Sequence, residues 1–498
     1  MKRLFKLIWG IMITAALFWY DGTAMATSSD RFHSSISEKT AALLQSVPRF
    51  YETYCTEDSS EALTNILTEV DAVFADETES VERLADLIQT LSDGIDQLQF
   101  HSDSTIPQIY LATDDGSGNS FGTSLDKSHG YVSAQITVVD EHGHVIAKDT
   151  GWNGKVRVRG NTTAQGEKKP YNIRFSRKTN LFDMGEAKKW VLLADLYDPT
   201  LMRNYLALDF GKYLGLQAAP DFKRIEVWID GVYRGVYLLT EKIEADQNRV
   251  NINGKKDSSD FLVELVFSGL REDDNTYLFT SSEKCFRLRE PENVSQQKLN
   301  QITDELNHFE AILASNNWDR VSEVIDLQSF VAFYIQNEYF KTIDFADTSV
   351  YFYRKDGRYY GGPGWDFDLS AGNCNPEKYG EFIRSYEGTI ASNAHYYQYL
   401  MKYPEFRLEV LKKYLAVDDY IHNIYKEGGY MDEQYEKFVD SFNRNNAIWF
   451  KGPERYIIWQ KTPGSTYEEN FEYLRNWLEQ RDIWLADYLR FLNNGWEY

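Results

Sequence analysis

The stretch "DTSVYFYRKDGRYYGGPGWDFDLSAG", residues 347–372, is a short β-like segment surrounded by helical patterns, and it carries two closely spaced acids. Asp366 and Asp368 stand one residue apart, behind glycines and a proline and ahead of another glycine. In an extended segment, side chains at i and i+2 point to the same face, so the two carboxylates would lie side by side and repel each other. The stretch therefore predicts a site where a further group compensates this repulsion.

The segments that flank this stretch have the apolar spacing of amphipathic helices. "SQQKLNQITDELNHFEAILAS" and "DLQSFVAFYIQNEYFK" precede it, and "NFEYLRNWLEQRDIWLADYLRFL" lies near the C-terminus. Before about residue 290, apolar and polar residues alternate instead, as in "YVSAQITVVDEHG". This order predicts an α+β protein, with a β-rich part over residues 105–290 and a helical part over residues 291–498.

Two features inside the β-rich part have recognisable turn or cap residues. "RIEVWIDGVYRGVYLLTEKI" predicts a hairpin, because Asp-Gly supplies the positive φ that a tight turn demands. "PTLMRNYLALDFGKYLG" predicts a helix that interrupts the strands and ends at Gly215.

Residues 35–99 repeat apolar side chains at three- and four-residue spacing in three blocks, which predicts a small three-helix unit. The acidic turn "ADETES" followed by "VERLADLIQTLSDGIDQL" resembles the FIVAR-type helical modules of bacterial surface proteins. This resemblance implies a spacer or accessory module, and no chemistry is visible in it.

The first 26 residues have the pattern of an export signal. Lys2, Arg3 and Lys6 precede a short apolar run, and "AMA" at 24–26 is a small-x-small cleavage site. We expect cleavage before Thr27, a secreted or cell-surface protein, and no membrane span after removal of the signal. A retained membrane anchor is the alternative.

Charge and cysteine content narrow the function classes. The net charge of −23 and the pI near 4.9 make nucleic acid an unsuitable partner, since phosphate binding needs a basic field. Cys55, Cys285 and Cys374 are far apart and odd in number, so at most one intramolecular disulfide could form. No C-x-x-C spacing is present and the histidines are scattered, which argues against zinc.

Four motifs in order carry a specific family resemblance. They are "VRVRGNTTAQGEKKPYNIRF", "WVLLADLYDPTLMRNYLALDFGKYLG", "IEVWIDGVYRGVYLLTEKIEADQNRVNI" and "GGPGWDFDLSAGN". Together they resemble the CotH family, the spore coat protein H type of atypical protein kinase. The resemblance implies a kinase-like fold of a β-rich N-lobe and a helical C-lobe, preceded here by the small helical unit. It also implies Mg²⁺ and ATP as cofactors and a protein substrate, such as a Ser-rich coat or surface protein.

Phosphoryl transfer requires a metal ion on the phosphates and a carboxylate near the incoming hydroxyl. Asp366 and Asp368 could share a hard cation through oxygen ligands, which would relieve their repulsion. The W-D-F-D resemblance makes Asp366 the better ligand. Asp344, some twenty residues upstream, is the candidate for orienting or deprotonating the acceptor hydroxyl, and Asp347 is its alternative.

A cation on the phosphates is also required, and Lys169 is the candidate. In "KKPYNIRF" it shares strand parity with Tyr171, which predicts that Lys169 points inward while Lys168 points away. An inward lysine needs a partner, and Glu241 is a plausible one. Further nucleotide-binding candidates at positions that match the family are Arg159, Asn161 and Arg203.

Two other functions stay open at this point. An exported protein meets little ATP, so the fold could serve as a catalytically inactive surface or scaffold module. Asp366-Phe367-Asp368 is also an Asp-x-Asp pattern, which can carry a divalent ion and a sugar nucleotide in a glycosyltransferase.

Overall fold

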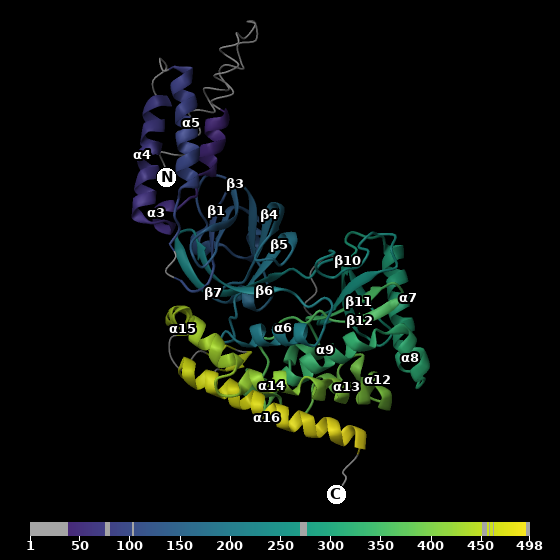
Figure 1. Cartoon of the computed structure of the whole chain (residues 1–498). Coiled ribbons are helices and arrows are strands. Elements are labelled where there is room, and N and C mark those ends of the chain that lie inside the picture. Colours follow the sequence, from purple (N-terminus) through teal and green to yellow (C-terminus); the bar gives the residue numbers. More distant parts are fainter. Residues whose placement is uncertain are drawn as a thin grey trace. The chain divides into compact units, whose positions relative to one another are not determined.

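A computed structural model of the chain describes residues 38–74, 80–101, 104–268, 276–450, 456–457, 459–461 and 463–494. Figure 1 shows an α+β protein with N-terminal helices, a β-barrel and a largely helical C-terminal region, so the predicted fold class is confirmed. The chain divides into two compact units, Met1–Ala194 with Arg224–Tyr237 (unit 1) and Asp195–Lys223 with Leu238–Tyr498 (unit 2). The predicted export signal lies outside the described residues.

The N-terminal part of unit 1 is helical, as predicted. Residues 38–46 are followed by α3 (Tyr51–Tyr54), α4 (Glu57–Phe74) and α5 (Val81–Asp96). Ser80 caps α5 by accepting a hydrogen bond from the Arg83 amide.

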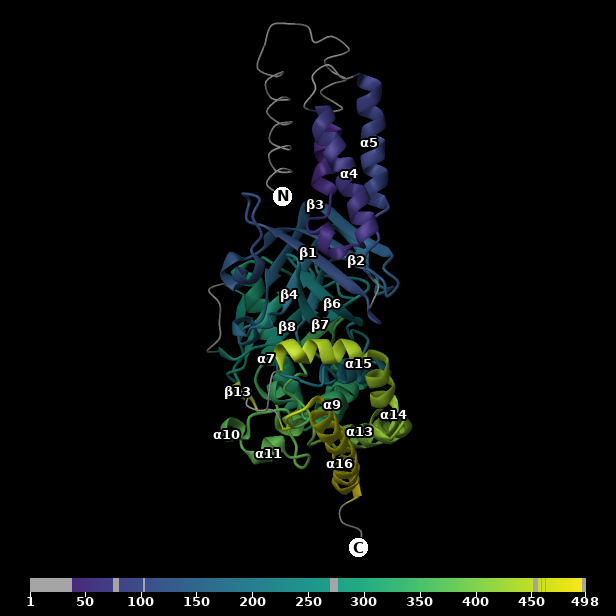
Figure 2. The same ribbon diagram turned by 90° about the vertical axis from the view of Figure 1, so that its left-hand side faces the viewer.

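These helices share a hydrophobic core with the barrel of the same unit. Tyr110 and Val139 of the barrel belong to the same buried cluster as the helical leucines. The Arg49 guanidinium donates to the Thr113 carbonyl at 2.6 Å and pairs with Asp114 at 2.9 Å. The helical module is therefore packed onto the strands of unit 1, as Figure 2 also shows, and is more than a tethered spacer.

The barrel is closed in the order β1-β2-β3-β4-β5-β7-β6. Its strands are β1 (Gln108–Asp114), β2 (Val132–Val139), β3 (Val145–Val158), β4 (Tyr171–Asn180), β5 (Glu186–Leu193), β6 (Phe222–Ile229) and β7 (Val232–Glu241). Asp230 and Gly231 between β6 and β7 have φ angles of 52° and 82°, which confirms the predicted hairpin. Ile136, Val156 and Trp190 are among the side chains that are fully buried in this unit.

Unit 2 combines one helix from the middle of the chain with a second sheet. The helix is α6 (Arg203–Tyr213), and Gly215 follows it at φ 83°, as its predicted stop requires. The sheet has the order β12-β11-β8-β10-β9. Its strands are β8 (Phe261–Leu265), β9 (Tyr277–Phe279), β10 (Cys285–Glu290), β11 (Val350–Lys355) and β12 (Arg358–Gly361).

β8 pairs antiparallel with β11. The strands between residues 261 and 290 therefore belong to unit 2, together with the helical part of the chain. The predicted boundary near residue 290 thus differs from the division into units. The difference arises because strands far apart in the sequence pair with each other, and no local sequence pattern predicts that pairing.

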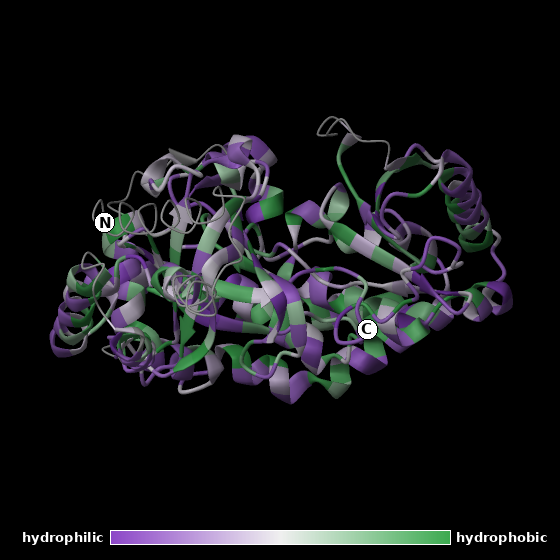
Figure 3. Ribbon diagram, turned by 90° about the horizontal axis from the view of Figure 1, so that it is seen from above, coloured by the Kyte–Doolittle hydropathy of each residue, from purple (hydrophilic) through white to green (hydrophobic). Residues whose placement is uncertain are grey.

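Long helices complete unit 2. They include α7 (Gln296–Leu313), α8 (Trp318–Val324), α9 (Leu327–Phe340), α13 (Pro404–Ala416), α14 (Asp418–Tyr425), α15 (Tyr430–Trp449) and α16 (Tyr467–Asn494). Every residue of α9 from Ser329 to Phe340 is buried, so α9 is the central helix of the unit. Figure 3 shows hydrophobic and hydrophilic residues alternating along the other ribbons, as expected for elements with one buried face. None of the helices in the described part of the chain is long and apolar enough to cross a membrane.

Candidate active site

The Asp366–Asp368 segment follows β12 in unit 2 without being a strand. Residues 362–367 have no regular secondary structure, and Asp366 has a φ of 66°. The prediction that strand parity aligns the two acids was therefore wrong, because a left-handed residue breaks the alternation of an extended chain. Asp366 is partly buried, and Asp368 is only 5% exposed.

Asp368 lies within a cluster of carboxylates. Burial raises its pKa well above the ordinary value, and the charges of Asp366, Asp195, Asp344 and Asp198 raise this pKa further. No hydrogen-bond donor contacts the Asp368 carboxylate within the described part of the chain. A buried acid without donors is costly unless it is neutral or paired with a cation.

Asp344 belongs to the same cluster. Loss of hydration raises its pKa to about 8, with contributions from the charges of Asp366 and Asp347. It lies on the short helix η5 (Ile343–Ala346), directly after α9. The structure therefore brings together Asp344, Asp366 and Asp368, which come from two separate stretches of the sequence, while Asp347 is exposed.

Two backbone hydrogen bonds hold the Asp344 loop against the loop that follows Asp368. The Ile343 amide donates to the Leu369 carbonyl at 3.4 Å, and the Ala371 amide donates to the Phe340 carbonyl at 2.6 Å. The two loops that carry these acids are thus held together by main-chain contacts, while the carboxylates themselves can still move.

Sequence reasoning missed Asp195 and Asp198, which follow β5 in the quoted motif "WVLLADLYDP". Asp195 has a φ of 47°, and Asp198 is fully buried. The available signal was two acids three residues apart after an apolar strand, just before a helix. The Asp198 carboxylate accepts hydrogen bonds from the backbone amides of Thr200, Met202 and Arg203, the Thr200 hydroxyl and the Arg203 guanidinium.

Arg203, predicted to contact phosphate, is 1% exposed and is held by protein atoms. Its Nη1 pairs with Asp198 at 2.6 Å. Its Nε and Nη2 donate to the carbonyls of Ser370 and Ala371 at 3.0 and 3.2 Å. In this arrangement Arg203 fixes the loop after Asp368 to the start of α6.

Asn204, the next residue of α6, makes the second such link. Its side-chain amide donates to Asp195 Oδ1 at 2.7 Å, and its oxygen accepts from the Phe367 amide at 2.8 Å. Ser349 donates to Asp366 Oδ2 at 3.2 Å. These neutral donors orient the acids without neutralising them.

Left-handed backbone conformations gather around the cluster. Besides Asp195 and Asp366, positive φ values occur at Lys341 (47°), Ser349 (58°) and Ala371 (45°). Each such non-glycine residue costs on the order of 1–3 kcal/mol, and this kind of strain concentrates at functional sites.

The cluster has the donor set that a hard divalent cation prefers, because its ligands are carboxylate oxygens. Among the described residues, no three of these acids bring ligand atoms within 4.8 Å of one another. Binding of a cation would therefore draw the carboxylates closer. The Asp368 carboxylate can move in this way because no donor among the described residues holds its oxygens.

In unit 1, the predicted orientation of the two lysines was wrong. Lys168 is fully buried, donates to the Val236 carbonyl at 2.5 Å, and lies over the Tyr237 ring at 4.8 Å. Lys169 is partly exposed and donates to the Ala164 carbonyl at 3.1 Å. β4 begins only at Tyr171, so strand parity does not extend back to the lysines.

The remaining candidates have local partners. The Asn161 side chain is exposed and accepts from Lys127 at 3.2 Å, next to Gly160 at φ 90°. The Arg159 amide donates to the Pro170 carbonyl at 3.0 Å. The structure thus places both residues at the turn between β3 and β4.

Glu241, predicted to pair with Lys169, has other partners in unit 2. It accepts from the Asp221 amide at 2.9 Å and forms an ion pair with Arg249 at 3.7 Å. Burial raises its pKa to about 7, while the Asp221 amide and the Arg249 charge act in the opposite direction.

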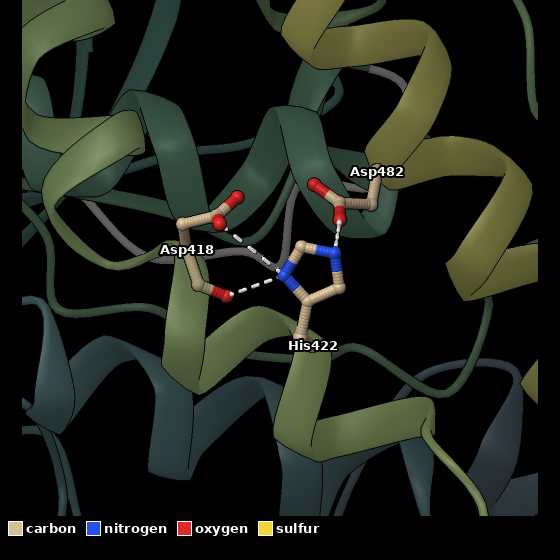
Figure 4. Close-up of side chains that lie close together, drawn as sticks. All are labelled: Asp418, His422 and Asp482. Atoms are coloured by element: carbon tan, nitrogen blue, oxygen red, sulfur yellow. Dashed lines mark hydrogen bonds and ion pairs between the residues drawn. The ribbon is translucent and has the colours of Figure 1, made fainter.

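A second group of potential ligands lies on α14 and α16 (Figure 4). Atoms of Asp418, His422 and Asp482 lie within 4.8 Å of one another. However, His422 directs Nδ1 to Asp418 and Nε2 to Asp482, so one nitrogen does not face both acids. Tyr414 and Tyr425 donate to Asp482 at 2.6 and 2.8 Å. We therefore interpret this group as a hydrogen-bonded contact between α14 and α16, and not as a metal site.

Comparison with known proteins adds one match. A family model described as "CotH kinase protein" matches residues 156–485, which is more than half of the chain. No curated protein shows a significant match. The matched range includes the whole carboxylate cluster.

Proposed function

The chain belongs to the CotH kinase protein family, and we propose from this membership that it transfers the γ-phosphate of ATP to a Ser or Thr hydroxyl of another protein. The observation that carries the proposal is the buried carboxylate cluster of unit 2, in which Asp368 has no hydrogen-bond donor within the described residues. A cation would stabilise acids placed in this way, and phosphoryl transfer needs one on the phosphates.

Asp366 and Asp368 would hold Mg²⁺, which when bound neutralises charge on the phosphate oxygens. Ser349 orients one oxygen of Asp366 at 3.2 Å, so that carboxylate is directed before a cation arrives. Asp368 would contribute a carboxylate whose oxygens accept no hydrogen bond from the described residues.

Asp344 would orient the acceptor hydroxyl or accept its proton. It lies in the same cluster as Asp366, and part of its surface remains exposed, as a group that meets a substrate requires. Asp347 is exposed and three residues away, and it stays the alternative.

We also propose that the nucleotide is contacted by Lys169, Glu241, Arg159, Asn161 and Arg203. Of these, Arg203 has its guanidinium engaged by Asp198 and two carbonyls, which favours a supporting role for it. We propose an extracytoplasmic acceptor from the predicted export signal, and a Ser-rich coat or surface protein as the acceptor from the family resemblance. N-terminal sequencing of the mature protein should find Thr27 first if that signal is cleaved.

The test is incubation of the purified chain with Mg²⁺ and γ-labelled ATP, followed by mass spectrometry of the chain and of a Ser-rich acceptor peptide. We expect labelled Ser or Thr with wild type and none with Asp366→Asn. Asp344→Asn should bind ATP normally and label about 10²- to 10⁴-fold more slowly.

The matched control is Asp356→Asn, an exposed acid in the β11–β12 turn of the same unit. It should label like wild type. A wild-type chain that binds ATP and Mg²⁺ but labels nothing would contradict the proposal and support a scaffold function.

A further inference from the structure

We infer that Asn204 is a positioning residue for the cation site, holding the Asp366–Asp368 segment and Asp195 at a fixed separation. This inference rests on the proposed function, because it assigns a role to Asn204 in the binding of the cation by the same acids.

Asn204 is 3% exposed, and both ends of its amide are used. The Nδ2 group donates to Asp195 Oδ1 at 2.7 Å, and Oδ1 accepts from the Phe367 amide at 2.8 Å. One partner is an acceptor and the other is a donor, so the amide has a single satisfying orientation. An amide can satisfy both partners at once, whereas a carboxylate can satisfy only the Phe367 amide.

The position of the Phe367 amide affects both Asp366 and Asp368. It belongs to the residue between Asp366 and Asp368, so fixing this peptide unit fixes the starting points of both side chains. Asp366 is left-handed at φ 66°, a conformation that few non-glycine residues adopt. The bond from Asn204 is one contact that keeps it there.

Arg203 and Asn204 hold opposite ends of the segment from Phe367 to Ala371. Arg203 holds the far end through the carbonyls of Ser370 and Ala371, and Asn204 holds the near end through Phe367. Because Asp198 anchors Arg203 itself at 2.6 Å, the start of α6 is a rigid platform for the segment. Supporting residues of this kind typically change metal affinity by about 10- to 100-fold when they are mutated.

Asn204→Asp is the sharpest variant. It keeps an acceptor for the Phe367 amide, but it replaces the donor to Asp195 with a negative oxygen. Asp195 is then repelled, and the spacing of the acids widens. We expect Mn²⁺ and Mg²⁺ to bind about 10- to 100-fold more weakly, with the maximal rate restored by excess Mg²⁺.

The control is Asn470→Asp. Asn470 is also 3% exposed, and its amide likewise bonds on both sides, to the Gly464 carbonyl, the Thr466 carbonyl and the Gly464 amide. A loss of cation affinity in Asn204→Asp alone would therefore reflect its place in the site and not general damage from a buried charge.

The measurement is calorimetric titration of Mn²⁺ into the purified wild type, Asn204→Asp and Asn470→Asp, with circular dichroism to confirm folding and label transfer at several Mg²⁺ concentrations. If Asn204→Asp does not fold, Asn204→Ser replaces it, with the same expected direction. Wild-type affinity in a folded Asn204 variant would overturn the inference while leaving the proposed function in place. A wild-type chain that binds no Mn²⁺ would overturn both.

Discussion

Two neighbouring regions of unit 2 bury an acid in opposite ways. In the turn before α6, Asp198 is fully buried and accepts five hydrogen bonds, including one from Arg203 at 2.6 Å. In the segment after β12, Asp368 is 5% exposed and accepts none from the described residues. The comparison teaches that two acids with similar burial can differ completely in their donors, and that only Asp368 of the two keeps carboxylate oxygens that a cation could occupy.

Glu338 and Arg481 repeat the first pattern elsewhere in the unit. Both are fully buried and pair at 2.8 Å, and Glu338 also accepts from the amides of Ile390 and Ser392. Glu241 is an intermediate case, because one oxygen accepts from an amide and the other has only the 3.7 Å ion pair with Arg249. These buried acids therefore form a series that mutation can test.

The largest expected effect is at the satisfied end of this series. Asp198→Ala should lower the free energy of unfolding by about 3–5 kcal/mol, because it leaves the Arg203 guanidinium buried without its carboxylate. Urea denaturation followed by circular dichroism measures this. A loss below about 1 kcal/mol would show that the two acids differ less than their contacts indicate.

The second effect concerns Mg²⁺ itself. At a concentration 100-fold above its dissociation constant, Mg²⁺ should raise the free energy of unfolding of the wild type by about 2.7 kcal/mol, since it binds only the folded chain. Asp366→Asn should show little of this gain. Thermal unfolding with and without Mg²⁺ tests it, and EDTA should reverse the shift.

Glu241 gives a smaller, pH-dependent effect. Its folded pKa of about 7 lies above its ordinary value, so its contribution to stability is fully present below about pH 4.5 and is lost as the pH rises towards 7. Asp221, Arg249 and Lys212 are the charged groups that act on it. Glu241→Gln should gain about 2–3 kcal/mol relative to wild type between pH 4.5 and 7.5 in urea denaturation. Parallel curves for the two proteins would contradict this.

The smallest effect has the opposite sign to the first. Asp368→Asn should raise the free energy of unfolding by about 1 kcal/mol in the absence of Mg²⁺ at a pH where Asp368 is ionised, because it removes an acid whose ionisation burial and the neighbouring acids oppose. The same variant should lose the stabilisation by Mg²⁺. A destabilised Asp368→Asn would indicate that Asp368 has a structural role like that of Asp198.

The sequence by itself determined the elements whose signals are local. Alternating residues, helical spacing and the Asp230-Gly231 turn specify the α+β order, because each depends on neighbours along the chain. The acids Asp344, Asp366 and Asp368 could also be selected, since their motifs are short and chemically distinctive. The proximity of Asp344 to the other two acids rested on the family resemblance, whereas the pairing of Asp366 with Asp368 rested on strand parity, which the structure does not have.

Only the tertiary structure decided which charged groups share an environment. Strand parity misplaced Lys168 and Lys169, because β4 starts after them. Asn204 showed no signal, since its partners Asp195 and Phe367 lie 9 and 163 residues away in the chain. The donors to Asp198 are local, two to five residues further along the chain. By contrast, the charges of Asp195, Asp198 and Asp344 that act on Asp368 come from distant parts of the sequence. Solvation and pairing depend on distance in space, which a pattern along the chain does not contain.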